Sequence, residues 1–219
     1  MDTMVDRQVG ELLDLLKELE IDERTIVFFC SDNGAAKRFD GVLDSSGPLR
    51  GFKRSLYEGG IRVPLIARWP GMTKAGTVSE HACYFADVMP TLAELAGALA
   101  YMPADVDGLS IVPALTGRAD EQKKHEFLYW EWQLYNWNKN EDVPDGLMQA
   151  VRMGRWKAVR HKSNVPFELY DLSSDIGEKN NIAAKRPAII AKIEEYIKRD
   201  RVKPREQIEP DKPEGKRFR

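Results

Sequence analysis

An apolar run that ends in an abrupt polar turn places the strongest limit on the fold of this chain. Residues 26–30 read Ile-Val-Phe-Phe-Cys, and Ser-Asp-Asn-Gly follows directly at 31–34. A run that is short, β-rich and apolar on both faces is typical of a central parallel strand covered by helices. Asp-Asn-Gly is also common turn chemistry, so these residues alone do not distinguish a turn from a site.

The residues before this strand have the spacing of an amphipathic helix. One face of segment 5–19 collects its apolar side chains, which are Val5, Val9, Leu12, Leu13, Leu16 and Leu19. A helix, a short link and a buried strand form one helix-to-strand unit of an α/β sheet. Ligands of such sheets gather at the carboxyl ends of the strands, where Asp32 and Asn33 stand. The position of the turn therefore favours a functional site.

Similar elements continue to about residue 120. Residues 35–60 lack a sustained periodicity and are rich in glycine, which predicts a long loop of the kind that is often functional. The pattern then predicts a strand at 61–69, a helix at 87–99 and a short helix at 108–117. We therefore predict one α/β domain over residues 1–120.

The pattern changes after residue 120. Strands are predicted at 126–135, 146–161 and 167–172, and a helix at 185–199. Gly154-Arg155 is a predicted hairpin turn inside the second of these segments. Strands followed by one helix predict a small antiparallel α+β module over 121–199. Residues 200–219 are charged and rich in proline, so we predict a poorly ordered tail there.

Charge and composition argue against two classes of partner. The chain has 33 Lys and Arg against 35 Asp and Glu, a formal net charge of -2, which implies no nucleic-acid partner. No apolar stretch approaches the roughly 20 residues of a membrane span. Cys30 and Cys83 make no disulfide framework, and Cys30 is predicted to be an inert core residue. His81, His125 and His161 lack neighbours at metal-ligand spacing, so they are predicted to be structural or surface residues.

The segment 47–71, GPLRGFKRSLYEGGIRVPLIARWPG, gathers basic side chains in a glycine-rich loop. Arg50, Lys53 and Arg54 lie in this loop, and Glu58-Gly59-Gly60 then lead into the predicted strand, with the glycines shaping the backbone. A carboxylate and an amide stand at the end of the preceding strand. Together they could place a metal ion and a cation around one anionic group.

Several segments taken together resemble the sulfatase family, part of the alkaline-phosphatase-like superfamily. In family order and spacing, the chain contains SDNG, LRGFKRSLYEGGIRVPLIARWPG, DVMPTLAELAG, DGLSIVPALTG, WK and ELYDL. The resemblance runs from Val5 to about Lys198. It implies an α/β fold, with a partial alkaline-phosphatase-like sheet and covering helices followed by a small antiparallel α+β C-terminal module. It also implies hydrolysis of sulfate esters by a formylglycine nucleophile made from a cysteine.

The resemblance implies roles for three residues. Asp32 and Asn33 match the family's ligands for a divalent metal, which is usually calcium, with magnesium as the alternative. A carboxylate and an amide oxygen suit such a hard cation. Lys53 matches the lysine that contacts the sulfate group, and as a catalytic residue it would offset charge on that group. Apart from the resemblance, Arg50 in the same loop is a weaker candidate for substrate binding, with a surface or structural role as the alternative.

The chain departs from the family in what it lacks. Neither Cys30 nor Cys83 stands in a Cys-x-Pro-Ser-Arg type motif, and the family's paired acidic ligands and its Gly-Lys-Trp-His segment, which precede the DNG strand, are absent. Calcium takes roughly 6–8 oxygen ligands, of which Asp32 and Asn33 supply two or three. We therefore predict the C-terminal portion of a sulfatase, inactive by itself, that needs the missing N-terminal ligands to hold its metal. Its uncovered apolar surfaces would favour association.

Two other classes of function stay open, so the sequence does not decide whether the chain belongs to an active enzyme. The first is a phosphoester or phosphonate hydrolase of the same superfamily, and the second is a non-catalytic remnant or binding module. The partner implied by the resemblance is a sulfated small molecule or glycan, and the location implied is periplasmic or secreted. The ester itself is not specified, because loops set specificity in such folds.

Overall fold

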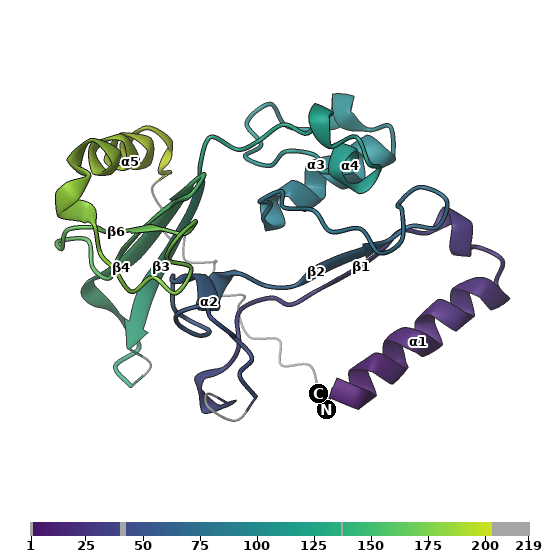
Figure 1. Cartoon of the computed structure of the whole chain (residues 1–219), viewed down its shortest axis with the longest axis horizontal. Coiled ribbons are helices and arrows are strands. Elements are labelled where there is room, and N and C mark those ends of the chain that lie inside the picture. Colours follow the sequence, from purple (N-terminus) through teal and green to yellow (C-terminus); the bar gives the residue numbers. More distant parts are fainter. Residues whose placement is uncertain (1, 40–42, 137, 203–219) are drawn as a thin grey trace, which may run out of the picture.

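The computed structural model describes residues 2–39, 43–136 and 138–202, and it contains two antiparallel sheets (Figure 1). The first part holds α1 (Asp2–Glu18), β1 (Val27–Cys30), α2 (Glu58–Ile61), β2 (Leu65–Arg68), α3 (Val88–Leu95) and α4 (Val112–Leu115). The second part holds β3 (Leu128–Asn136), β4 (Glu141–Met153), β5 (Trp156–Arg160), β6 (Glu168–Asp171) and α5 (Pro187–Asp200). Strands β1 and β2 pair with each other, and the other four form a sheet in the order β3-β4-β5-β6.

The hairpin predicted at Gly154-Arg155 is confirmed. Strand β4 ends at Met153, β5 begins at Trp156, and these two residues face each other in the register. Gly154 has a φ of +57°, a conformation that glycine adopts without the steric cost that other residues meet. Two turn residues therefore reverse the chain and set the register of the sheet centre.

The central parallel strand predicted at 26–30 is wrong for this chain. Strand β1 pairs antiparallel with β2, from Val27 opposite Arg68 to Cys30 opposite Leu65. The side chain of Phe29 is 40% exposed, and Cys30 is also exposed rather than an inert core residue. An apolar run indicates that other residues bury the strand, but it does not show that those residues belong to the same chain.

The strand predicted at 61–69 is shorter than expected. Glu58, Gly59 and Gly60 do not lead into it but form the single turn of α2, and β2 begins only at Leu65. Pro64 stands directly before β2, and proline is tolerated at the start of a strand but not within its ladder.

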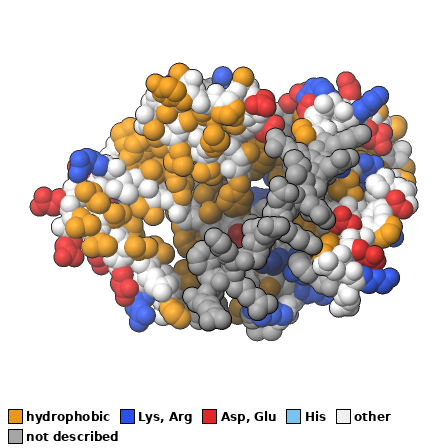
Figure 2. All heavy atoms as spheres, turned by 180° about the vertical axis from the view of Figure 1, so that it is seen from behind, with side chains coloured by type: hydrophobic (Ala, Val, Ile, Leu, Met, Phe, Trp, Pro, Cys, Tyr) orange, Lys and Arg blue, Asp and Glu red, His pale blue; other side chains and the backbone are white. Residues whose placement is uncertain are grey.

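The half of the molecule that carries α1, β1, β2 and α3 exposes a broad apolar face (Figure 2). Large exposed side chains there are Leu12, Leu15, Leu19, Phe29, Leu65, Ile66, Val88, Met89 and Leu92. Contiguous apolar surface of this kind marks an interface in soluble proteins. Among the helices of the described residues, none is both long and apolar enough to cross a membrane.

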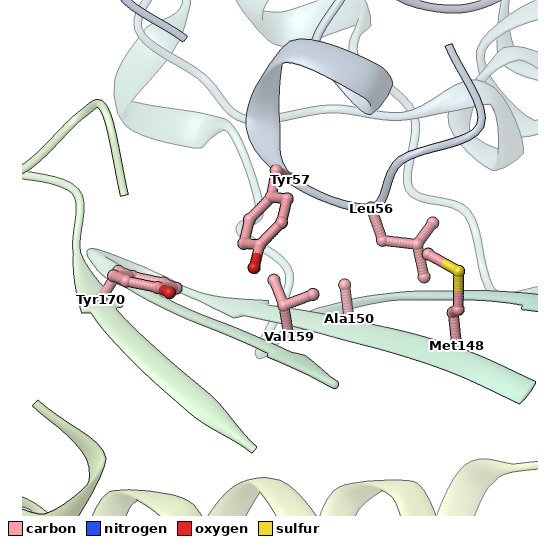
Figure 3. Packing of buried hydrophobic residues seen from close by; sticks show 6 residues of the cluster. All are labelled: Leu56, Tyr57, Met148, Ala150, Val159 and Tyr170. Carbon is pink, nitrogen blue, oxygen red and sulfur yellow. The ribbon is translucent and has the colours of Figure 1, made fainter. Parts of the chain in front are cut away.

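The buried core lies on both faces of the four-stranded sheet. On one face, Leu56 and Tyr57 reach down from the segment before α2 (Figure 3), and they meet Met148, Ala150, Val159 and Tyr170. On the other face, side chains of alternate strand positions pack against Ile193 and Ile197 of α5. The segment that leads into α2 is therefore anchored on the second sheet. The division of domains at residue 120 stays a prediction, and residues 203–219 of the predicted tail lie outside the described part.

Candidate active-site loops

The turn after β1 presents its carboxylate to solvent. The Ser31 hydroxyl donates to the carbonyl oxygen of Asn33 at 2.9 Å, and the Asn33 amide nitrogen donates to the carbonyl oxygen of Gly34 at 3.1 Å. These bonds leave the side-chain oxygen of Asn33 available as an acceptor. Asp32 is exposed, and its carboxylate has no hydrogen bond or ion pair within the described residues.

Gly34 is a glycine because of a close backbone approach. It lacks the positive φ that usually requires glycine in a turn. A Cβ atom at this position would instead lie 1.8 Å from the carbonyl oxygen of Gly59 in α2. The amide of Gly34 donates to the carbonyl oxygen of Gly60 at 3.0 Å, so the turn rests directly on α2. The sequence predicted a turn glycine, whereas the structure shows a contact glycine.

The loop that carries Lys53 joins the same turn. The amide of Lys53 donates to the carbonyl oxygen of Ala35 at 2.8 Å. Arg54, the next residue, has a φ of +74°, which is strained for a residue with a side chain. The Lys53 ammonium is exposed and has no partner among residues 2–39, 43–136 and 138–202. The structure therefore brings the Asp32-Asn33 turn and the Lys53 loop together through backbone hydrogen bonds.

The donor set of the turn fits a hard cation but is incomplete. Asp32 offers an unpaired carboxylate and Asn33 an amide oxygen, which are the ligand types that calcium and magnesium prefer. Within the described residues, however, no group of three or more His, Cys, Asp or Glu side chains is placed to hold a metal ion. A metal bound here would need further oxygen ligands.

Arg50 serves as an anchor in this structure. Its guanidinium lies 3.8 Å from the centroid of the Tyr57 ring, and it donates to the Tyr170 hydroxyl at 3.0 Å and to the carbonyl oxygen of Glu178 at 2.7 Å. These contacts tie the glycine-rich loop to β6 and to the loop that follows it. Substrate binding by Arg50 stays a prediction, and the observed contacts favour a structural role.

A polar cluster that sequence reasoning missed supports this anchor. The Tyr57 hydroxyl donates to Oε2 of Glu168 at 2.6 Å and lies 2.8 Å from Nε2 of His161. The Tyr170 hydroxyl donates to the same carboxylate oxygen at 2.7 Å. Burial, with the hydrogen bond to Glu168, raises the pKa of Tyr170 to about 12. The Tyr170 hydroxyl therefore keeps its proton at neutral pH and remains the donor to Glu168. No signal in the sequence pairs these distant residues.

A buried ion pair was also missed. Oε1 of Glu58 lies 2.9 Å from Nζ of Lys157, and the two side chains are 2% and 0% exposed. Burial lowers the pKa of Lys157, and the nearby negative charge of Glu58 opposes this shift only in part. Burial alone would raise the pKa of Glu58, but Lys157 and then Arg152 outweigh it and hold that pKa below its usual value. Glu58 and Lys157 stand in the YEGG and WK segments, to which the sequence assigned no ionic partner.

Two hollows flank the glycine-rich loop. One, of about 530 Å³, is lined by 47–50 and 177–179, and the other, of about 100 Å³, lies between 35–36 and the loop. Asp32 and Lys53 line neither of these two hollows, and both residues are exposed.

A second buried carboxylate fixes the start of α3. Oδ1 of Asp87 accepts from the amide of Leu109 at 2.7 Å and lies 2.8 Å from Nε2 of His125. Oδ2 accepts from the amide of Tyr84 at 3.0 Å. His125 precedes β3, so this pair ties α3 to the segment that enters the second sheet.

Comparison with known proteins gives consistent matches along the chain. A family model described as N-sulphoglucosamine sulphohydrolase, C-terminal, matches residues 51–203, and one described as Sulfatase matches residues 3–98. A Formosa agariphila protein named Sulfatase is 33% identical over an alignment of 198 residues, and this alignment covers 84% of this chain and 35% of that protein. The chain thus spans about a third of the length of this relative.

Solved structures agree with these matches. The structure of Ps i-CgsB in complex with k-i-k-neocarrahexaose has a TM-score of 0.72 and 30% identity, over 89% of this chain and 40% of the other. A phosphonate monoester hydrolase of Agrobacterium radiobacter has a TM-score of 0.69 and 27% identity, over 91% and 39%. The predicted α/β fold class, with its alkaline-phosphatase-like architecture, is confirmed.

Proposed function

Because the chain belongs to the sulfatase family, we propose that it is the C-terminal part of a catalytic unit that hydrolyses sulfate esters. The observation that carries this proposal is the joining of the turn and the loop. The two motif segments that the family resemblance assigns to metal and sulfate share backbone hydrogen bonds, from Lys53 to Ala35 and from Gly34 to Gly60. The segments that carry Asp32, Asn33 and Lys53 are therefore neighbours in the fold.

The family resemblance suggests the proposed roles, and the chemistry of the side chains suits them. Asp32 and Asn33 would contribute oxygen ligands to a divalent cation, which would polarise the sulfate oxygens. Lys53, an exposed ammonium without a partner in the described part, would contact the sulfate and offset the charge that develops on it. The nucleophile, a formylglycine, and the remaining metal ligands would come from polypeptide that this chain does not contain. The substrate would be a sulfated small molecule or glycan.

The exposed apolar face supports the same proposal. The side chains on α1, β1, β2 and α3 are too numerous and too close together for an ordinary water-facing surface. The Formosa relative is about three times as long as the matched region, since the match covers 35% of it. We propose that the polypeptide which completes the catalytic unit packs on this face and covers Phe29, Leu65 and Ile66.

One finding favours a second candidate function. The similarity to a phosphonate monoester hydrolase, with its TM-score of 0.69, keeps phosphoester or phosphonate hydrolysis open for the same site. The ammonium of Lys53 and a divalent cation would serve a phosphoryl group equally well, because both groups place negative charge on oxygen.

The test uses the protein translated from the complete reading frame that contains this chain. It is assayed with 4-methylumbelliferyl sulfate, the matching phosphate and a phenylphosphonate ester, with calcium or magnesium present. We expect kcat/KM to be highest for the sulfate. A preference for phosphate or phosphonate would select the second candidate, and no hydrolysis of any of the three would reject both.

In the same assay, we expect Lys53→Ala to lower kcat/KM for the preferred ester by about a hundredfold, the effect of removing one donor to a charge that develops in the transition state. Lys37→Ala is the matched control, because Lys37 is also an exposed lysine that follows the turn, and it should change kcat/KM by less than about twofold. Equal losses in the two variants would show that Lys53 does not act on the sulfate.

A further inference from the structure

Glu178 occupies an unusual place between the glycine-rich loop and the four-stranded sheet. It lies in the loop that follows β6, has a φ of +49° and is 0% exposed. A residue with a side chain is strained in this conformation and keeps it only when its surroundings hold it there. Its backbone is bonded to Arg50 of the glycine-rich loop, and its side chain is bonded to Glu58 at the start of α2.

Two hydrogen bonds link Glu178 to the segment that carries Lys53. Oε2 of Glu178 accepts from the amide of Glu58 at 2.8 Å. Its carbonyl oxygen accepts from the guanidinium of Arg50 at 2.7 Å. The amide of Gly59 in turn donates to the carbonyl oxygen of Arg50 at 2.7 Å. Lys53 lies between these two anchor points, so Glu178 holds both ends of its loop.

The second carboxylate oxygen of Glu178 has no hydrogen-bond partner within the part of the chain that the structure describes. Oε1 is buried and makes no hydrogen bond, although a charged carboxylate in such a place needs one. The charged groups that act on it are Glu58 on α2, Lys157 on β5 and Arg50 in the loop. Lys157 and Arg152 already form ion pairs with Glu58, at 2.9 Å and 3.4 Å. A negative charge on Glu178 would therefore keep the Glu58 amide at Oε2, but among the described residues it has no hydrogen bond at Oε1 and no ion pair.

We propose that Glu178 is a pH-sensitive latch: in its protonated form it holds the Lys53 loop on the sheet, and in its ionised form it releases that loop. With the carboxyl group neutral, Oε2 still accepts from Glu58 and the orphan oxygen carries no charge. Loss of the proton to water leaves a buried anion, which is stabilised when the loop opens and water reaches it. Glu178 is thus a positioning residue for Lys53, and its catalytic consequence rests on the proposed function.

The direction of the pH effect follows from the geometry and agrees with the electrostatics. Burial raises the pKa of Glu178 to about 7, while the charge of Lys157 opposes that shift. We call the form with the Lys53 loop held on the sheet closed, and the form with this loop released open. A raised pKa in the closed form means that Glu178 binds its proton more tightly there than in the open form. The closed form is therefore most stable below the ordinary pKa of 4.5, loses stability as the pH rises toward 7 and changes little beyond it. Between pH 6 and pH 8, the opening equilibrium should rise roughly tenfold.

Hydrogen exchange of the full chain tests the latch without metal or substrate. The amides of Glu58, Gly59 and Lys53 make the hydrogen bonds named above. Their protection factors, which are corrected for the direct effect of pH on exchange chemistry, should fall about tenfold from pH 6 to pH 8. Amides of the β4–β5 ladder should not change, because that part of the sheet stays closed.

The variant Glu178→Gln supplies the decisive comparison. Glutamine keeps an oxygen that accepts from Glu58 but cannot ionise, so its protection factors should change by less than about twofold over the same range. Glu23→Gln is the matched control at an exposed position and should behave like the unmodified chain. A tenfold fall that persists in Glu178→Gln would overturn the proposal, as would unchanged protection in the unmodified chain. Either result leaves the ester-hydrolysis proposal untouched, since the exchange experiment needs no activity.

Discussion

Replacing Lys157 by methionine should lower the free energy of unfolding by about 3–5 kcal/mol at pH 7, measured by urea or guanidinium denaturation. The reason is the carboxylate left behind. Glu58 is 2% exposed and would lose the ammonium that lies 2.9 Å away, while Arg152, at 3.4 Å, is the nearest cation that remains. A buried carboxylate that has lost its shortest ion pair, and keeps only the longer contact with Arg152, is among the few single changes that cost this much.

The double variant Glu58→Gln/Lys157→Met separates the ion pair from packing. Removing both charges should recover at least about 2 kcal/mol of the loss, because a buried pair often contributes little net stability once both partners are gone. Lys162→Met is the matched exposed control, and we expect a change within about 0.5 kcal/mol. If the double variant were as unstable as Lys157→Met, the loss would come from altered packing around position 157 and not from the unbalanced charge of Glu58.

Gly34→Ala should lower the free energy of unfolding by about 3 kcal/mol and displace the Asp32-Asn33 turn from α2. The added Cβ would lie 1.8 Å from the carbonyl oxygen of Gly59, and the neighbouring atoms are backbone atoms that cannot rotate away. In the complete protein, the same substitution should weaken calcium binding, because the turn that carries the proposed ligands must move. Denaturation and calcium titration measure the two effects.

Gly10→Ala is the control for that substitution. Gly10 lies inside α1, and a Cβ there would meet nothing within 4 Å. Alanine at an open helical position should raise stability by about 0.5–1 kcal/mol. A comparable loss in both variants would mean that the effect of Gly34→Ala does not come from the contact with Gly59.

The local patterns in the sequence predicted most elements of the fold. Segment 5–19 has the apolar spacing of a helix and forms α1, and the Gly154-Arg155 turn separates two strands as expected. These predictions depend on spacing within a few residues, which the sequence records directly. The predicted environment of β1, a central parallel strand, was wrong. The residues that bury a strand are distant in the sequence or lie outside the chain, so local spacing does not record them.

The same limit applies to the candidate site. Asp32, Asn33 and Lys53 were found through motif segments, and the structure joins their loops. Glu58 was predicted only to shape the backbone, yet it forms a buried ion pair with Lys157. A single sequence does not indicate such a pair, because each residue by itself is predicted to be an ordinary surface charge.

The contacts that hold the Lys53 loop join residues that are far apart in the chain. Glu58 and Lys157 are 99 positions apart, and Arg50 and Glu178 are 128 apart. Contacts across such separations close long loops of chain and tend to form late in folding. On the ribosome, residues 50–60 emerge long before their partners do. A nascent chain that stops before β5 would contain every proposed site residue and still leave the Lys53 loop without its support.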